Sequence, residues 1–173
     1  EIVLPNSIES IGRRAFLNCQ ALKKFQLPDS IETIADYAFY SCSQLKSLSI
    51  SAKTIGDYAF SFCSELESVN FSDKLEIIGD ESFNSTGLSE VSVPSAVSHI
   101  GERAFATNKI EKITVDENNQ YYTSIDGVLF NKSETEIIDY PNYTQAESYA
   151  VPQSVTSIGE YAFGGDMQSL KNV

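Results

Sequence analysis

The chain has 173 residues, 42% of them hydrophobic, which suits one folded domain with a continuous core. Its formal net charge is −12 and it contains no long run of Lys or Arg, which argues against nucleic acid or an anionic membrane as a partner. Its apolar runs are far shorter than the roughly 18 residues of a membrane span, and its first residues do not resemble a signal peptide, so membrane insertion of this segment is not expected.

A hexapeptide that ends in Phe recurs along the chain. The Phe residues of the first five copies are 21 to 23 positions apart, and 58 positions separate the fifth copy from the sixth. Self-similarity at such a period indicates a repeat protein whose units stack along one axis. The copies are IGRRAF (11–16), IADYAF (34–39), IGDYAF (55–60), IGDESF (78–83), IGERAF (100–105) and IGEYAF (158–163).

An apolar run with alternating spacing follows each of the first five copies and predicts a β-strand. A repeat of about 22 residues cannot cover its own apolar side, so the repeats stack and each apolar column is buried against the next. The expected fold is an α/β-type solenoid, a right-handed superhelix with a concave parallel β-sheet. The predicted strand runs are 22–27, 45–50, 66–71, 88–93 and 110–115.

The Gly and the acid of the hexapeptide predict the structure of the convex side. An acid after the Gly suits the first turn of a helix, where free N–H groups favour negative charge, so short helical or 3-10 turns are expected there. Ala35 interrupts the Gly column and would be strained at positive φ. We therefore predict that this column reflects close packing between repeats rather than left-handed backbone.

The 58-residue gap predicts an inserted β-meander at 116–145. Asp126-Gly127 is a two-residue type I′ hairpin signal between 121–125 and 128–130, and 136–140 is a third strand that Pro141 ends. The chain is then a single domain, 1–173, with repeats at 1–115 and 146–173. Because the repeat pattern runs into both ends, we expect this chain to be a fragment of a longer one.

The repeat resembles the BspA-like, Treponema pallidum type of leucine-rich repeat, whose unit resembles C-x-x-L-x-x-[IV]-x-[LI]-P-x-x-[LIV]-x-x-I-G-x-x-A-F-x-x-C. The segment DGVLFN (126–131) also resembles that family, whereas Ala35 and Ser82 depart from its motif. The resemblance implies a leucine-rich-repeat solenoid of a secreted or cell-surface protein. It also implies adhesion to host or matrix proteins such as fibronectin or fibrinogen.

The residues do not predict a catalytic, cofactor or metal site. Cys19, Cys42 and Cys63 share one column, which favours a ladder of small residues over a disulfide between adjacent turns, and one file of thiolates cannot surround a metal ion. His99 is the only histidine and falls in a polar column without a nucleophile and acid beside it. The run 116–119 favours a polar turn over a weak Ca²⁺ site. We expect no pocket that gathers titratable groups with shifted pKa values.

Two surfaces are candidates for partner binding. Repeat proteins usually bind through the solvent side of their strands, although this face lacks the aromatic residues of interface hot spots. The inserted meander is richer in aromatic residues, whereas Tyr37, Tyr58 and Tyr161 are expected to cover the core. The concave-face candidates are Lys24, Gln26, Ser47, Ser49, Ser68, Asn70, Glu90, Ser92, Lys112 and Thr114. The insertion candidates are Tyr121, Tyr122, Phe130, Tyr140 and Tyr143.

These observations lead to two hypotheses of function. The first is a non-enzymatic cell-surface module that adheres to host or matrix proteins. The alternative is a structural spacer that presents another domain of a larger surface protein. Sequons at Asn70, Asn84, Asn131 and Asn142 would carry glycans only in a eukaryotic source.

Overall fold

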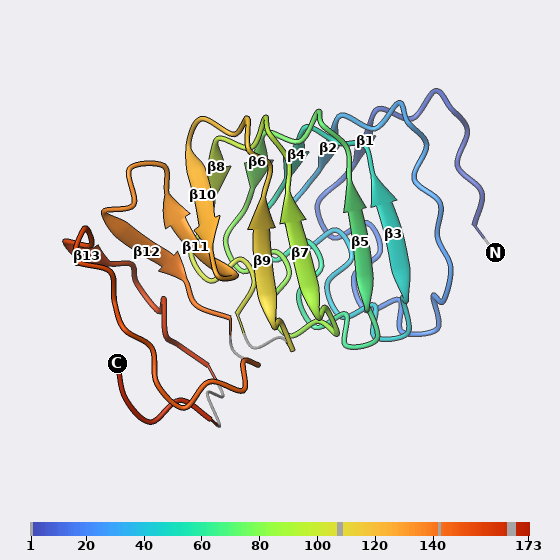
Figure 1. The fold of residues 1–173 in the computed structure, drawn as a ribbon. Coiled ribbons are helices and arrows are strands. Elements are labelled where there is room, and N and C mark those ends of the chain that lie inside the picture. Colours follow the sequence, from blue (N-terminus) through green and yellow to red (C-terminus); the bar gives the residue numbers. More distant parts are fainter. Residues whose placement is uncertain (1, 107–108, 142, 166–168) are drawn as a thin grey trace.

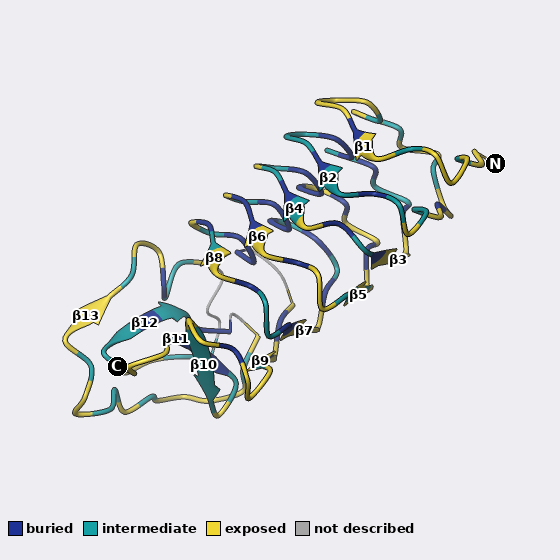
Figure 2. Ribbon diagram, turned by 90° about the horizontal axis from the view of Figure 1, so that it is seen from above, coloured by how far each residue is buried: buried dark blue, intermediate teal, exposed yellow. Residues whose placement is uncertain are grey.

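Successive repeats stack side by side in the computed structural model, which describes residues 2–106, 109–141, 143–165 and 169–173 (Figure 1). Two rows of strands follow the stack, one of short strands and one of long strands (Figure 2). The short strands form one parallel sheet in the order β1 (Ser10–Ile11), β2 (Thr33–Ile34), β4 (Thr54–Ile55), β6 (Ile77–Ile78) and β8 (His99–Ile100). The long strands are β3 (Ser47–Ile50), β5 (Ser68–Phe71), β7 (Glu90–Val93) and β9 (Lys112–Val115). The predicted parallel β-solenoid is confirmed.

The long-strand side differs from the predicted continuous sheet. β3 pairs with β5 and β7 pairs with β9, whereas β5 and β7 lie side by side without pairing. Residues 24–27 of the first repeat are not a strand. The predicted alternation is kept across the break, because Leu48, Val91 and Ile113 are all buried.

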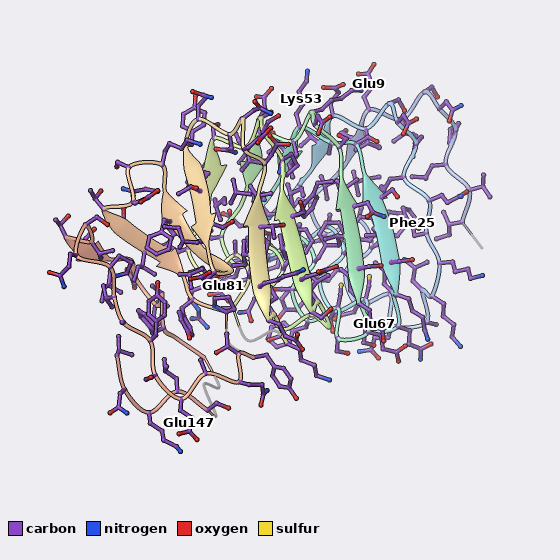
Figure 3. The ribbon with its side chains drawn as sticks, in the orientation of Figure 1. Glu9, Phe25, Lys53, Glu67, Glu81 and Glu147 are labelled. Carbon is purple, nitrogen blue, oxygen red and sulfur yellow. The ribbon has the colours of Figure 1, made fainter. Side chains whose placement is uncertain are left out.

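The Phe column forms the centre of the core. The fully buried rings of Phe39, Phe60 and Phe83 stack with centroid separations of 5.1 and 5.2 Å. From the long-strand side, Phe25 meets Phe16 and Phe39 edge-on at 4.8 and 5.1 Å (Figure 3). Such aromatic pairs contribute about 0.5–1.5 kcal/mol each beyond the burial of their area. The column therefore ties each repeat to the next.

The convex turns are not helical, which corrects the prediction of helical or 3-10 turns, since the described residues contain no helix. In the first repeat, 12–15 and 16–19 are tandem four-residue turns, each closed by a backbone bond from the fourth residue to the first. Arg14 and Asn18, at their third positions, have φ of 60° and 59°, as in type II turns. This geometry lets the Arg14 N–H donate to the Asp36 carbonyl of the next repeat, at 3.1 Å. A helix would keep such N–H groups within its own repeat.

The Gly column allows close approach between repeats, as predicted. A Cβ on Gly79 would lie 2.6 Å from the backbone carbonyl carbon of Gly56, and Gly79 does not have a positive φ. The acid after the Gly has a different role from the one predicted. The Asp57 carboxylate accepts a hydrogen bond from the backbone N–H of Asp80, at 3.0 Å, and the Asp80 carboxylate accepts one from Glu102, at 2.9 Å. The acids therefore cap backbone groups of the following repeat.

The insertion contains the predicted hairpin. β10 (Tyr122–Ile125) and β11 (Val128–Asn131) pair antiparallel, and Asp126 and Gly127 between them have φ of 51° and 85°. β12 (Glu136–Asp139) pairs antiparallel with β11 and parallel with β13 (Ser157–Ile158). β12 is therefore both the third strand of the meander and a short strand of the solenoid, so the solenoid resumes at β12 rather than after residue 145.

A buried asparagine anchors the insertion to the preceding repeat. The Asn119 amide donates to the carbonyls of Pro94 and Val97, at 2.8 and 2.9 Å. Its side-chain oxygen accepts from the backbone N–H groups of Tyr121 and Tyr122, both at 2.8 Å. The run 116–119 thus forms a turn that is held by its own polar side chains.

Candidate functional site

The predicted concave-face residues all lie exposed on the side of the long strands. The ladder of β3 with β5 and that of β7 with β9 place eight of these residues in adjacent pairs. We call this set the long-strand face: Lys24, Gln26, Ser47, Ser49, Ser68, Asn70, Glu90, Ser92, Lys112 and Thr114. The pairs are Ser47 with Ser68, Ser49 with Asn70, Glu90 with Lys112, and Ser92 with Thr114.

A shallow groove with a volume of about 820 Å³ lies at the N-terminal end of the long-strand face. Five residues of the face line it, namely Lys24, Gln26, Ser47, Ser49 and Asn70. Apolar side chains from 2–4 and from the first strand run line it too. The groove therefore combines hydrogen-bonding groups with apolar surface, which the rest of the face lacks.

The aromatic residues of the insertion do not form one surface, which corrects their joint assignment. Phe130 is fully buried and Tyr140 is 2% exposed, and both belong to a core cluster with Val128 and Ile137. The Tyr122 hydroxyl accepts a hydrogen bond from the Ile100 N–H, at 3.0 Å. Only Tyr121 and Tyr143, which are 54% and 46% exposed, present aromatic surface to a partner.

The cysteines form the predicted ladder. Cys42 and Cys63 donate from Sγ to the carbonyls of Phe16 and Phe39, each at 3.1 Å, and all three cysteines are free thiols. The neighbouring Cys42 sulfur and burial raise the pKa of Cys63, so this thiol is poorly reactive. Within the described ranges, no cluster of His, Cys, Asp or Glu is arranged to hold a metal ion.

The predicted sequons differ in exposure. Asn70 is exposed on β5, whereas Asn84 is buried. The Asn131 side chain is engaged with its own turn, since its oxygen accepts from the Thr135 N–H at 2.9 Å. Asn142 lies outside the described residues.

A stripe of aromatic and charged side chains runs along the turns, and the sequence pattern predicted only its tyrosines. Tyr37 and Tyr58 stack at 4.8 Å, and the Tyr58 hydroxyl donates to Glu81, at 3.4 Å. Arg103 pairs with Glu81 at 3.6 Å and places its guanidinium 4.7 Å from the ring centre of Tyr161. The tyrosines therefore cover the turns, while one arginine bridges to a repeat beyond the insertion.

Arg103 makes that bridge because the repeat between it and Tyr161, which runs from β12 to Tyr140, is two residues short. Ile137 pairs with Ile158, and the Tyr140 N–H donates to the Ala162 carbonyl, as the Phe39 N–H does to the Ala59 carbonyl. Tyr140 thus occupies the Phe column and stacks on Phe163 at 4.9 Å. Three positions separate Ile137 from Tyr140, whereas five separate Ile158 from Phe163. The first of the two tandem turns is missing from this repeat.

A cavity of about 270 Å³ lies where the missing turn would be. Its wall from the preceding repeat is 100–104, its wall from the following repeat is 159–160, and Glu136, Ile138 and Asp139 of the short repeat line it between them. Burial raises the pKa of Asp139 to about 7. The expectation that no pocket gathers titratable groups with shifted pKa values therefore has one exception, because Asp139 lines this cavity. Aligning EIIDY (136–140) with SIGEYAF (157–163) is the sequence signal that would have located it.

The chain matches the model of the BspA type leucine rich repeat region, in six copies, over residues 1–111, 77–150 and 140–173. No curated protein matches it. The structure is similar to that of the pneumococcal vaccine antigen PcpA, with 34% sequence identity, a TM-score of 0.73, and coverage of 78% of this chain and 34% of that one.

The structure is also similar to a leucine rich cell surface protein from Faecalibacterium prausnitzii A2-165. The identity is 27%, the TM-score is 0.81, and the match covers 95% of this chain and 50% of that one. The chain thus spans about a third of the length of the first relative and half of the second. A leucine-rich repeat protein from Bacteroides ovatus, at 23% identity and a TM-score of 0.63, shares the fold. The chain belongs to the BspA-type leucine-rich repeat family.

Proposed function

We propose that this chain is a non-enzymatic binding module of a cell-surface or secreted protein. In this proposal it adheres to a host or matrix protein such as fibronectin or fibrinogen. The observation that carries the proposal is the long-strand face, a continuous exposed surface with a groove at one end. Two structural relatives, a vaccine antigen and a cell surface protein, support a surface location.

The groove is the part of the face best suited to a partner side chain. The long-strand face is otherwise flat and polar, and its Lys112–Glu90 ion pair, at 3.2 Å, is exposed and contributes little to stability or affinity. In the groove, apolar walls beside Ser49 and Asn70 supply contact area together with hydrogen-bonding groups. Tyr121 and Tyr143 of the insertion form a second, smaller contact surface in this proposal.

Surface plasmon resonance on the immobilised chain tests the proposal, with soluble fibronectin and fibrinogen as analytes. The double variant Ser49→Arg/Asn70→Arg fills the groove and should weaken binding at least tenfold. His99→Arg, on the exposed short-strand β8, is the matched control and should leave binding unchanged. The absence of binding at micromolar concentrations, or an equal loss in His99→Arg, would overturn the proposal.

The second candidate is a spacer that presents another domain of a larger surface protein. It is favoured by the lack of Trp, Tyr and Arg on the long-strand face, since those residues dominate interface hot spots. A spacer would tolerate Ser68→Arg and Glu90→Lys in the full-length protein without loss of adhesion. A binding module would lose adhesion in the same variants.

A further inference from the structure

Two backbone N–H groups beside the cavity lack the hydrogen-bond partners that the corresponding groups have in a regular repeat. In a regular repeat, the Tyr58 N–H donates to the Asp80 carbonyl of the next repeat, and the Asp80 N–H donates to the Asp57 carboxylate. The corresponding N–H groups of Arg103 and Glu160 face the missing turn and have no hydrogen-bond partner within the described parts of the chain. The site is therefore open because of the two-residue deletion and is not a packing defect of the regular fold.

The cavity is strongly acidic. Its walls carry Glu102 from the preceding repeat and Glu160 from the following one, and Glu136 and Asp139 come from β12 itself. Among the described residues, Arg103 is the only cation that lines the cavity, and it is already engaged with Glu81 and the Tyr161 ring. The backbone of Asp139 pairs with Leu129 in the β11–β12 ladder, but its carboxylate has neither a hydrogen bond nor an ion pair within the described residues. A half-buried carboxyl group of this kind is stabilised when a cation reaches it.

We propose that this cavity binds the primary ammonium group of a lysine side chain presented by a partner protein. Acidic residues line the cavity on three sides, which disfavours an anion, and the described acids are not arranged to hold a metal ion. A volume of about 270 Å³ accommodates several atoms of an aliphatic chain as well as its ammonium group. Ile100, Gly101 and Ala104 line the cavity and provide apolar contact for methylene groups, and Asp139 accepts the charged hydrogen bond.

The proposal is separate from that for the long-strand face. The cavity lies beside β8, β12 and β13, whereas the groove lies beside β3 and β5. A failure of fibronectin or fibrinogen to bind would therefore overturn the proposal for the groove but not the proposal for the cavity. A variant of Asp139 should not alter binding at the groove.

Nuclear magnetic resonance titration of the 173-residue chain with Nα-acetyl-lysine N-methylamide tests this proposal. Saturable shifts should appear at the backbone amides of Gly101, Arg103 and Glu160. The bound ammonium should also lower the pKa of Asp139, so affinity should rise at least fivefold between pH 6 and pH 8. The same amide of norleucine, which lacks the charge, should produce no saturable shift.

Two variants provide the comparison. Asp139→Asn should weaken binding at least fivefold, whereas Asp73→Asn, at an exposed acid far along the chain, should bind as the wild type does. Glu136→Gln tests the wall independently if Asp139→Asn does not fold, and it should also weaken binding. Absence of shifts at millimolar capped lysine, equal binding by Asp139→Asn, or tighter binding of putrescine than of capped lysine would overturn the assignment.

Discussion

Replacement of the buried Asn119 tests how the insertion is held to the solenoid. Asn119→Ala removes the donors to the carbonyls of Pro94 and Val97, which are both buried residues. Each buried polar group that is left unsatisfied lowers the free energy of unfolding by about 1–3 kcal/mol. The N–H groups of Tyr121 and Tyr122 lie nearer the surface, so water replaces part of the hydrogen bonds that they lose. We therefore expect the free energy of unfolding to fall by about 2–4 kcal/mol.

Urea denaturation followed by circular dichroism measures this loss, and amide hydrogen exchange shows where it occurs. Stacked repeats can open locally, so protection should fall first at β10 and β11 and least at β2. Asn118→Ala is the matched control, because Asn118 is exposed and its side-chain amide donates only to Asp116 within the described part of the chain. The control should change stability by less than about 0.5 kcal/mol. An Asn119→Ala protein as stable as this control would refute the assignment of Asn119 as an anchor.

Three further predictions follow from the packing between repeats and from the cavity. Gly79→Ala should lower the free energy of unfolding, measured by urea denaturation, by about 1–3 kcal/mol, because the added Cβ meets the Gly56 backbone. Gly12→Ala, whose added Cβ meets nothing within 4 Å, should be neutral. Equal effects of the two variants would contradict close packing between repeats. Cys63 should react with a thiol reagent far more slowly than the partly exposed Cys19, and equal rates would contradict the buried ladder. Asp139 keeps its proton to a pH of about 7 in the folded chain and loses it near pH 4 when unfolded, so the folded state binds more protons between these values and the unfolding free energy falls as pH rises. Asp139→Asn removes this contribution, so the stability of the variant relative to wild type should increase from pH 4 to pH 7, and a constant difference would refute the raised pKa.

Several features of the fold could be predicted from the sequence because they depend on local patterns repeated many times. The period of the Phe column, the alternation in the strand runs and the small residues of the Gly and Cys columns each predicted a contact between the same positions of successive repeats. The hairpin at Asp126-Gly127 was also predictable, because its turn requires positive φ at two residues that tolerate it. The positions of the long-strand face follow from the same alternation.

Other features were decided by the tertiary structure. The acid after Gly suits the start of a helix as well as a ladder of hydrogen bonds between repeats. The structure has tandem type II turns instead of a helix, because these turns let backbone N–H groups bond to the adjacent repeat. Tyr140 became a core residue because β12 pairs with β13 and carries it into the Phe column. The cavity around Asp139 arises from the same pairing, since a deletion of two residues opens space only where full repeats stand on both sides of it.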